Sequence, residues 1–189
     1  MGATQYYTAT SLDGYIADEN NSLDWLFEVD RGDDAGESYE AFFADVGAMA
    51  MGATTYEWVL GHERVLEEPD KWRAWYGDTP CWVFTHRTFP VVPGANIVFV
   101  EGDVAPVHEQ MADAAGGKNV WLVGGGELVG QFHDHGLLDE LFVQFGSVTL
   151  GAGKPLLPRT IVDPPLKLLS VRAIGTGFAE LNYEVQRVE

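Results

Sequence analysis

Three glycines that follow a strongly apolar run are the residues in this chain best placed to hold a ligand. Residues 120–123 (VWLV) lead directly into Gly124, Gly125 and Gly126, and a helix-compatible segment follows. Glycine lets the backbone approach a ligand closely, and a helix that begins there points free N–H groups at an anion. The spacing Gly-x-Gly-x-x-x-Gly differs from the dinucleotide fingerprint of a Rossmann fold. The stretch therefore indicates either a phosphate or pyrophosphate site or a tight turn that only packs a helix against a strand.

Two further apolar runs end in residues that suit an anion. Residues 48–51 (AMAM) and 81–84 (CWVF) are each followed by small, hydroxylic or basic side chains. Those side chains are Gly52, Ala53, Thr54 and Thr55 after the first run, and Thr85, His86 and Arg87 after the second. The threonines after Gly52 are candidates to cap a helix or to offer hydroxyls to a phosphate on its first turn.

The elements that must position these residues form an α/β fold. Continuous apolar runs bounded by glycine are typical of strands buried on both faces of a parallel sheet, whose carboxyl ends lie along one edge, where ligands of such sheets bind. Residues 166–173 and 178–185 flank a glycine-containing turn and predict a closing antiparallel hairpin. We therefore predict a mostly parallel sheet with helices on both faces. Residues 23–27 and 148–155 are predicted as loops.

The composition narrows the function classes. The chain has 189 residues, 46% hydrophobic content and a formal net charge of −18, which suits one domain and disfavours nucleic acid and anionic membranes as partners. The amino-terminal residues lack the basic and apolar regions of a signal peptide, so we expect a cytoplasmic protein. Cys81 is the only cysteine, and we expect it to be buried. Neither the acidic residues 28–37 nor His133 and His135 have convincing metal-ligand spacing, so no metal is expected.

Residues 8–17 (TATSLDGYIA) resemble the opening strand of the dihydrofolate reductase superfamily, in the form carried by the reductase domain of riboflavin biosynthesis proteins (the RibD C-terminal domain). Residues 51–57 resemble the strand–glycine–helix junction of that family, and residues 123–126 resemble its glycine turn. Residues 137–141 and 150–156 resemble its later motifs. These similarities occur in the family order along nearly the whole chain, and they imply a single dihydrofolate reductase-like domain over residues 1–189.

The resemblance implies a reductase that takes hydride from NADPH. By position, Ala9 and Ile16 would contact the nicotinamide, and residues 52–55 would meet the pyrophosphate. Residues 85–87 would surround the adenosine 2′-phosphate, and residues 124–126 would pass under the cofactor, with a cis peptide bond within the glycine pair. Folate reductases usually have a basic residue after the junction glycine, whereas this chain has an alanine there. Arg87 is then the main cation for the 2′-phosphate.

The resemblance also implies a substrate, a small heterocycle of the pterin, folate or pyrimidine type. Asp30 follows Trp25 at about the offset of the carboxylate that supports protonation in folate reductases, so we predict Asp30 as the catalytic acid and Trp25 as a substrate contact. Gln144 is predicted to form hydrogen bonds with the edge of the heterocycle. The alternatives are the 5-amino-6-(5-phosphoribosylamino)uracil reductase of riboflavin biosynthesis, with Arg31 and Lys154 as candidate phosphate ligands, and a catalytically silent dinucleotide-binding protein. The family resemblance also favours a homodimer.

Overall fold

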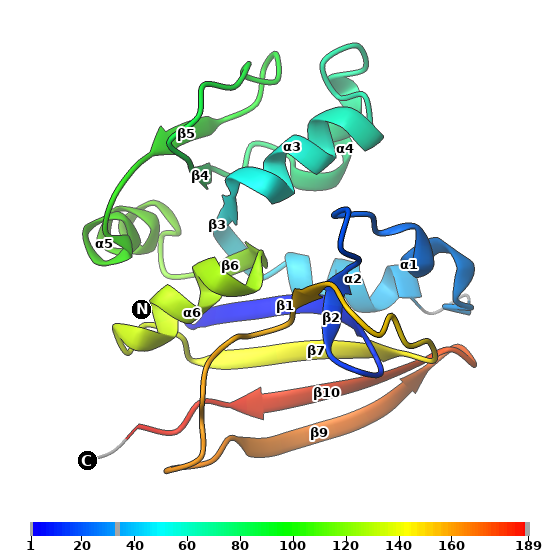
Figure 1. The fold of residues 1–189 in the computed structure, drawn as a ribbon. Helices are drawn as coiled ribbons and strands as arrows, with labels where there is room; N and C mark the ends of the chain where they lie inside the picture. The colour runs from blue at the N-terminus through cyan, green and yellow to red at the C-terminus, as the bar shows by residue number, and fades with distance from the viewer. Residues whose placement is uncertain (1, 33–34, 188–189) are drawn as a thin grey trace.

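The computed structural model describes residues 2–32 and 35–187, and a large sheet runs through this part of the chain (Figure 1). Its eight strands, in spatial order, are β5 Ile97–Val100, β4 Cys81–Phe84, β3 Val46–Gly52, β6 Asn119–Gly124, β1 Thr4–Ser11, β7 Glu140–Gly146, β10 Phe178–Glu184 and β9 Lys167–Ile174. The strands from β5 to β7 are mutually parallel, and β10 is antiparallel to both β7 and β9. The mostly parallel sheet and the closing hairpin are therefore confirmed.

Helices cover both faces of the sheet. One face packs against α2 Ala35–Phe43, α3 Ala53–His62 and α4 Asp70–Tyr76, and the other packs against α5 Val104–Ala114 and α6 Gly126–Asp134. Side chains of a strand alternate between faces, so neighbours in sequence enter different cores. Tyr6 and Leu122 belong to the α5–α6 core, whereas Tyr7 and Trp121 pack on the α2–α4 side. None of the helices in the described ranges is both long and apolar enough to span a bilayer.

Two predicted loops contain regular structure instead. Residues 24–28 form the short helix α1 Asp24–Glu28, and part of the second loop forms β8 Lys154–Pro155, which pairs with β2 Tyr15–Ala17. The loop predictions were wrong at these positions, because both elements depend on contacts with residues far away in the sequence. Helix α1 has no capping side chain and buries a single residue, Trp25, against the sheet. Strand β8 has only two residues and exists through its pairing with a strand far away in the sequence.

Candidate active site

A cleft runs along the carboxyl ends of the parallel strands, where ligands of open α/β sheets bind. It consists of two adjoining cavities of about 740 Å³ and 620 Å³. The residues that line both cavities are Asn21, Gly52, Ala53, Thr54 and Leu128. Because these walls are shared, the two cavities form one continuous groove over the ends of β1, β3, β4 and β6.

All of the residues predicted to contact the cofactor line this cleft. The first cavity is bordered by Ala9, Ile16, Gly52, Ala53, Thr54, Thr55, Gly124, Gly125 and Gly126. The second is bordered by Thr85, His86 and Arg87, together with Gly52, Ala53 and Thr54. The structure thus brings together residues that lie more than a hundred positions apart in the sequence, in an order that suits an extended ligand.

Two helix N-termini open onto the cleft without a side-chain cap. Gly52 is the N-cap of α3 and Gly125 is the N-cap of α6, and within the described residues neither helix has a side-chain capping hydrogen bond. Thr54 and Thr55 lie inside the first turn of α3 and do not cap it. Uncapped N–H groups attract anions, reinforced by the helix dipole. The two helix starts lie side by side, since a methyl group on Gly52 would lie 3.7 Å from the backbone N of Gly125. Together they offer N–H groups suited to a pyrophosphate.

The glycine turn leaves room above its middle residue. A methyl group added at Gly125 would contact only Cδ1 of Ile16, at 3.9 Å. Gly124 has a φ of +147°, which disfavours other residues, and a methyl group at Gly126 would clash with the carbonyl oxygen of Pro155 at 2.4 Å. The peptide bond between Gly124 and Gly125 is cis, as the resemblance implies. Gly125 is therefore the glycine of this turn that faces open space, while its neighbours are fixed by conformation and packing.

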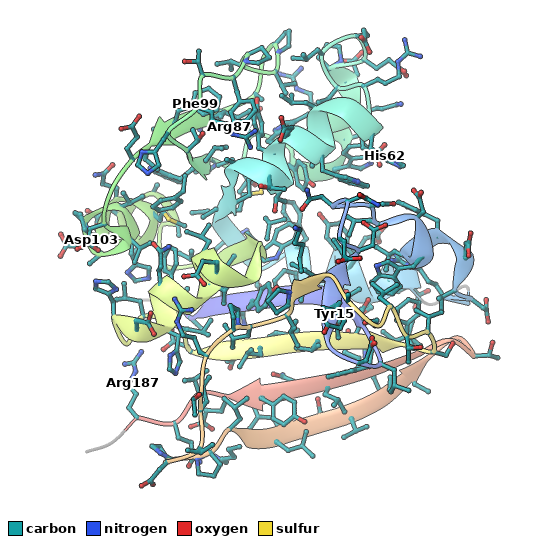
Figure 2. All side chains as sticks on the ribbon, viewed as in Figure 1. Tyr15, His62, Arg87, Phe99, Asp103 and Arg187 are labelled. Carbon is teal, nitrogen blue, oxygen red and sulfur yellow. The ribbon has the colours of Figure 1, made fainter. Side chains whose placement is uncertain are left out.

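The end of the cleft predicted to hold the adenosine carries charges of both signs. Arg87 pairs with Glu57 of α3, with 2.9 Å between Nη1 and Oε2, and its guanidinium lies 4.8 Å from the ring centroid of Phe89. Figure 2 labels Arg87 close to the start of α3. His86 lies 3.6 Å from Glu101, and both carboxylates line the second cavity. A 2′-phosphate would have to displace Glu57 from Arg87, whereas a free ribose hydroxyl would meet carboxylates that can accept its hydrogen bonds.

The RibD C-terminal domain family has a sequence model that matches residues 4–179 of this chain. The chain belongs to this family. Since the RibD C-terminal domain is a reductase family, the protein is an oxidoreductase at that coarse level. The chain is also 31% identical over 180 residues to YwjB, an uncharacterized protein of Bacillus subtilis strain 168, with 95% of this chain and 96% of YwjB covered.

Solved structures show the same RibD C-terminal domain fold. A protein from Shewanella sp. PV-4 assigned to riboflavin biosynthesis gives a TM-score of 0.78 at 24% identity, with 98% of this chain and 99% of that chain covered. The diaminohydroxyphosphoribosylaminopyrimidine deaminase/5-amino-6-(5-phosphoribosylamino)uracil reductase of Thermotoga maritima gives a TM-score of 0.68 at 17% identity. The match covers 98% of this chain and 57% of the Thermotoga chain. At these identities the likeness establishes the fold.

Asp30 does not have the surroundings of a catalytic acid in this RibD C-terminal domain. Its side chain is exposed, and it accepts hydrogen bonds from the backbone N–H of Gly32 and from both the N–H and the hydroxyl of Thr176. The Thr176 hydroxyl is the main cause that holds the pKa of Asp30 below its usual value. A general acid near neutrality needs the opposite shift. The prediction for Asp30 was therefore wrong, and Asp30 fastens the β9–β10 turn to the segment after α1.

Trp25 and Gln144 also lie outside the lining of the two cavities. Trp25 is buried in an apolar cluster with Val29, Ile174 and Phe178, while its neighbour Leu26 faces the cleft. The predicted substrate contact of Trp25 is thus replaced by a packing role, because α1 turns that side chain toward the sheet. Gln144 is buried on β7, in a hydrogen-bonded polar row that starts beside the cleft residue Ala9.

Several lining residues were not predicted from the sequence. Trp58 follows Thr54 and Thr55 at helical spacing, so the period of α3 was a signal that could have placed it on the cleft wall. Asn21 has a positive φ of 62° and borders both cavities, but nothing in the sequence distinguishes it from an ordinary turn residue. Lys154, a candidate phosphate ligand, does line the first cavity.

Asp13 joins two loops near the cleft. Its carboxylate accepts hydrogen bonds from the Ser11 hydroxyl at 2.6 Å and from the backbone N–H groups of Leu150 and Gly151 at 3.1 and 2.7 Å. These bonds, chiefly the one from Ser11, hold the pKa of Asp13 below its ordinary value. The loop after β1 is thereby tied to the loop after β7, close to Ile16 on the cleft wall.

Proposed function

We propose that this protein is an NADPH-dependent reductase that transfers hydride to a small heterocycle of the pterin, folate or pyrimidine type. The observation that supports the proposal most strongly is the pair of uncapped helix starts at Gly52 and Gly125, which lie side by side on one wall of a cleft lined by all of the predicted cofactor contacts. The group fits because open N–H donors, a glycine turn that leaves room for the ligand and an arginine at the far end of the cleft are features that suit a dinucleotide.

NADPH would supply the hydride, and the chain would supply orientation and shielding. Ala9 and Ile16 border an apolar part of the first cavity and would hold the nicotinamide ring flat. The N-termini of α3 and α6 would bind the pyrophosphate. Arg87 would bind the 2′-phosphate in exchange for its contact with Glu57. The substrate would lie in the same cavity, beside Leu26 and Trp58.

Two alternatives have specific support. A reductase acting on a ribosylamino-pyrimidine phosphate needs a cation near the nicotinamide, and Lys154 lines the first cavity while Arg31 lies half-buried above the ring of Phe178. A catalytically silent binder would use the same dinucleotide cleft. With Asp30 removed from consideration, the acidic residue that lines the first cavity is Glu127, whose carboxylate is engaged by Arg159.

The experiment that tests the proposal compares thermal unfolding with NADPH, NADP+, NADH and flavin, followed by cofactor oxidation with a panel of dihydropterins and pyrimidines. A ligand at a hundredfold excess over its dissociation constant stabilises the fold by about 2.7 kcal/mol, or roughly 5–10 °C for a domain of this size. No shift with either reduced dinucleotide would refute the proposal. A shift without oxidation of the cofactor by any substrate would favour the silent binder.

We further propose that the protein is a homodimer and acts in the cytoplasm. Leu168, Leu169 and Val171 of the edge strand β9 are 51, 44 and 60% exposed, and β9 contains no carboxylate. Two copies that each carry a net charge of −18 repel one another. The β9 edge offers apolar side chains together with the cations Lys167 and Arg172, so it is a surface that two copies can share with little repulsion. The single cysteine is buried and free, which suits a reducing compartment.

A further inference from the structure

Arg159 spans α6 and joins the two ends of that helix. Its Nη2 and Nη1 donate hydrogen bonds to the two carboxylate oxygens of Glu127, at 2.8 and 3.0 Å. Its Nε donates to Oδ2 of Asp134 at 2.8 Å. Glu127 lies in the first turn of the helix, and Asp134 is its last residue. A single guanidinium therefore binds a carboxylate at each end of α6.

Gly130 makes room for this guanidinium. It is a buried residue of α6, and a methyl group on it would lie 2.6 Å from Cζ of Arg159. Glycine inside a helix is unfavourable relative to alanine, and the close approach of the guanidinium is the reason for it at this position. The side chain of Arg159 is 19% exposed, whereas that of Glu127 is 66% exposed. The arginine is thus packed against the helix, and it holds a carboxylate that would otherwise move freely in solvent.

The segment that carries Arg159 is itself fixed against the start of α6. After β8 the chain runs beside this helix (Figure 1). A methyl group on Gly126 would lie 2.4 Å from the carbonyl oxygens of both Pro155 and Leu156. The N–H of Leu156 donates to the carbonyl oxygen of Gly14 at 2.9 Å. These backbone contacts set the position of the guanidinium without any ligand.

The carboxylate that Arg159 binds belongs to a residue of the proposed cofactor site. Glu127 follows the glycine turn, and it is the acidic residue among the described residues that line the first cavity. Because Gly125 is the N-cap, Glu127 is the second residue of α6, and its backbone N–H is one of the open donors at the helix start. Its side chain therefore places a negative charge beside donors that would bind a negative ligand.

Protonation does not remove this charge at neutral pH. The hydrogen bonds from Arg159 are the main cause that holds the pKa of Glu127 below its usual value. An ionised carboxylate released at the start of a helix can accept from the open N–H groups and would repel a phosphate there. The two-point contact with Arg159 instead occupies both carboxylate oxygens and supplies the opposite charge.

We propose that Arg159 is a positioning residue for the dinucleotide. It holds the Glu127 carboxylate away from the start of α6 and cancels its charge, so that the diphosphate can bind to the N–H groups of the first turn. Arg159 lines neither cavity, so it acts through Glu127. The inference rests on the proposed function in taking a diphosphate as the ligand of this helix start.

The test is a double-mutant cycle read by calorimetric titration of NADPH. Arg159→Met keeps an unbranched side chain and removes the charge, and it should weaken NADPH binding about three- to tenfold at about 0.01 M salt. Adding Glu127→Gln to Arg159→Met removes the released charge, and it should restore the parent affinity to within about twofold. A loss of packing would not be reversed by the second change, which restores no contact of Arg159.

Asp134→Asn is the matched control. It removes the other carboxylate bound by Arg159 and leaves the contact with Glu127, so it should leave NADPH affinity unchanged. Salt gives a second readout, because the Debye length falls from about 30 Å at 0.01 M to about 3 Å at 1 M. The difference between Arg159→Met and the parent should therefore nearly vanish at high salt. Thermal melts show that each variant is folded under the conditions of the titration.

Inorganic pyrophosphate separates this inference from the proposed function. It carries the diphosphate without either nucleoside, so the same cycle measured with it tests the start of α6 alone. If the parent protein binds pyrophosphate but no nicotinamide dinucleotide, the proposed function fails, and the pyrophosphate cycle decides the role of Arg159. If the parent binds neither ligand, both are refuted.

Three outcomes would overturn the role of Arg159 while NADPH still binds the parent. They are an equal affinity of Arg159→Met and the parent, a loss that Glu127→Gln does not restore, and a loss that persists unchanged in high salt. A loss of affinity in Glu127→Gln alone would also overturn it, because the carboxylate would then be a ligand contact itself.

Discussion

Replacement of Gly125 by alanine separates a ligand-binding role of the glycine turn from a packing role. In the protein the new methyl group would meet only Cδ1 of Ile16 at 3.9 Å, which is ordinary contact. Gly125 has φ −84° and ψ 177°, an extended conformation that alanine adopts readily. At Gly126 the same change would place a methyl group 2.4 Å from the carbonyl oxygens of Pro155 and Leu156. The two neighbouring substitutions should therefore act in opposite ways.

The magnitudes follow from these contacts. Glycine to alanine at a compatible position changes the free energy of unfolding by about 0.4–1 kcal/mol in the stabilising direction, so Gly125→Ala should fold normally. If the cofactor passes over this residue, the methyl group occupies space that the ligand needs, and overpacking costs about 1–3 kcal/mol. That cost corresponds to a roughly five- to 150-fold weaker binding of NADPH. Gly126→Ala should instead lower the free energy of unfolding by about 1–3 kcal/mol or more.

The assay pairs chemical denaturation, which reports the free energy of unfolding, with calorimetric titration of NADPH under conditions where each variant is folded. The expected result is a stable Gly125→Ala protein with weakened NADPH binding, beside an unstable Gly126→Ala protein. If Gly125→Ala is stable and binds NADPH as tightly as the parent, no cofactor lies over the turn. The glycines would then serve only to pack α6 against β6, and the dinucleotide site would have to be sought elsewhere.

Four further predictions concern single side chains. Arg87→Ala should weaken the binding of NADPH much more than that of NADH in a titration. Glu57→Gln should strengthen the binding of NADPH, because the carboxylate that competes for Arg87 is lost. Equal effects on both cofactors would place the 2′-phosphate away from Arg87. Asp30→Asn should leave turnover unchanged across the pH range and lower the melting temperature, whereas a loss of turnover at high pH would restore Asp30 as the acid. The folded-state pKa of Asp13 lies below its ordinary value of 3.8, so its stabilising effect is present above pH 3.8 and is lost as the pH falls through the folded pKa; the melting temperatures of the parent and Asp13→Asn should converge there. Val171→Lys should give a monomer by light scattering, and a parent that is already monomeric at micromolar concentration would contradict the homodimer.

The sequence by itself determined the fold class and most of the cleft. Apolar runs such as residues 81–84 and 120–123 are long enough, and sharply enough ended by glycine or hydroxylic residues, to define buried parallel strands without reference to the rest of the chain. Since the carboxyl ends of parallel strands lie along one edge of the sheet, the residues that follow those runs must lie close together. That local rule is why the predicted cofactor contacts line one continuous groove.

The tertiary structure alone determines the surroundings of the residues predicted to contact the substrate. The offset of Asp30 from Trp25 says nothing about burial, and it is the contact with Thr176 in the β9–β10 turn that holds Asp30 at the surface. The polar row through Gln144 and Glu180 joins residues that are neighbours only because β10 inserts between β7 and β9. Such long-range pairings leave no periodic trace in the sequence, because each polar side chain taken alone is compatible with an exposed strand position.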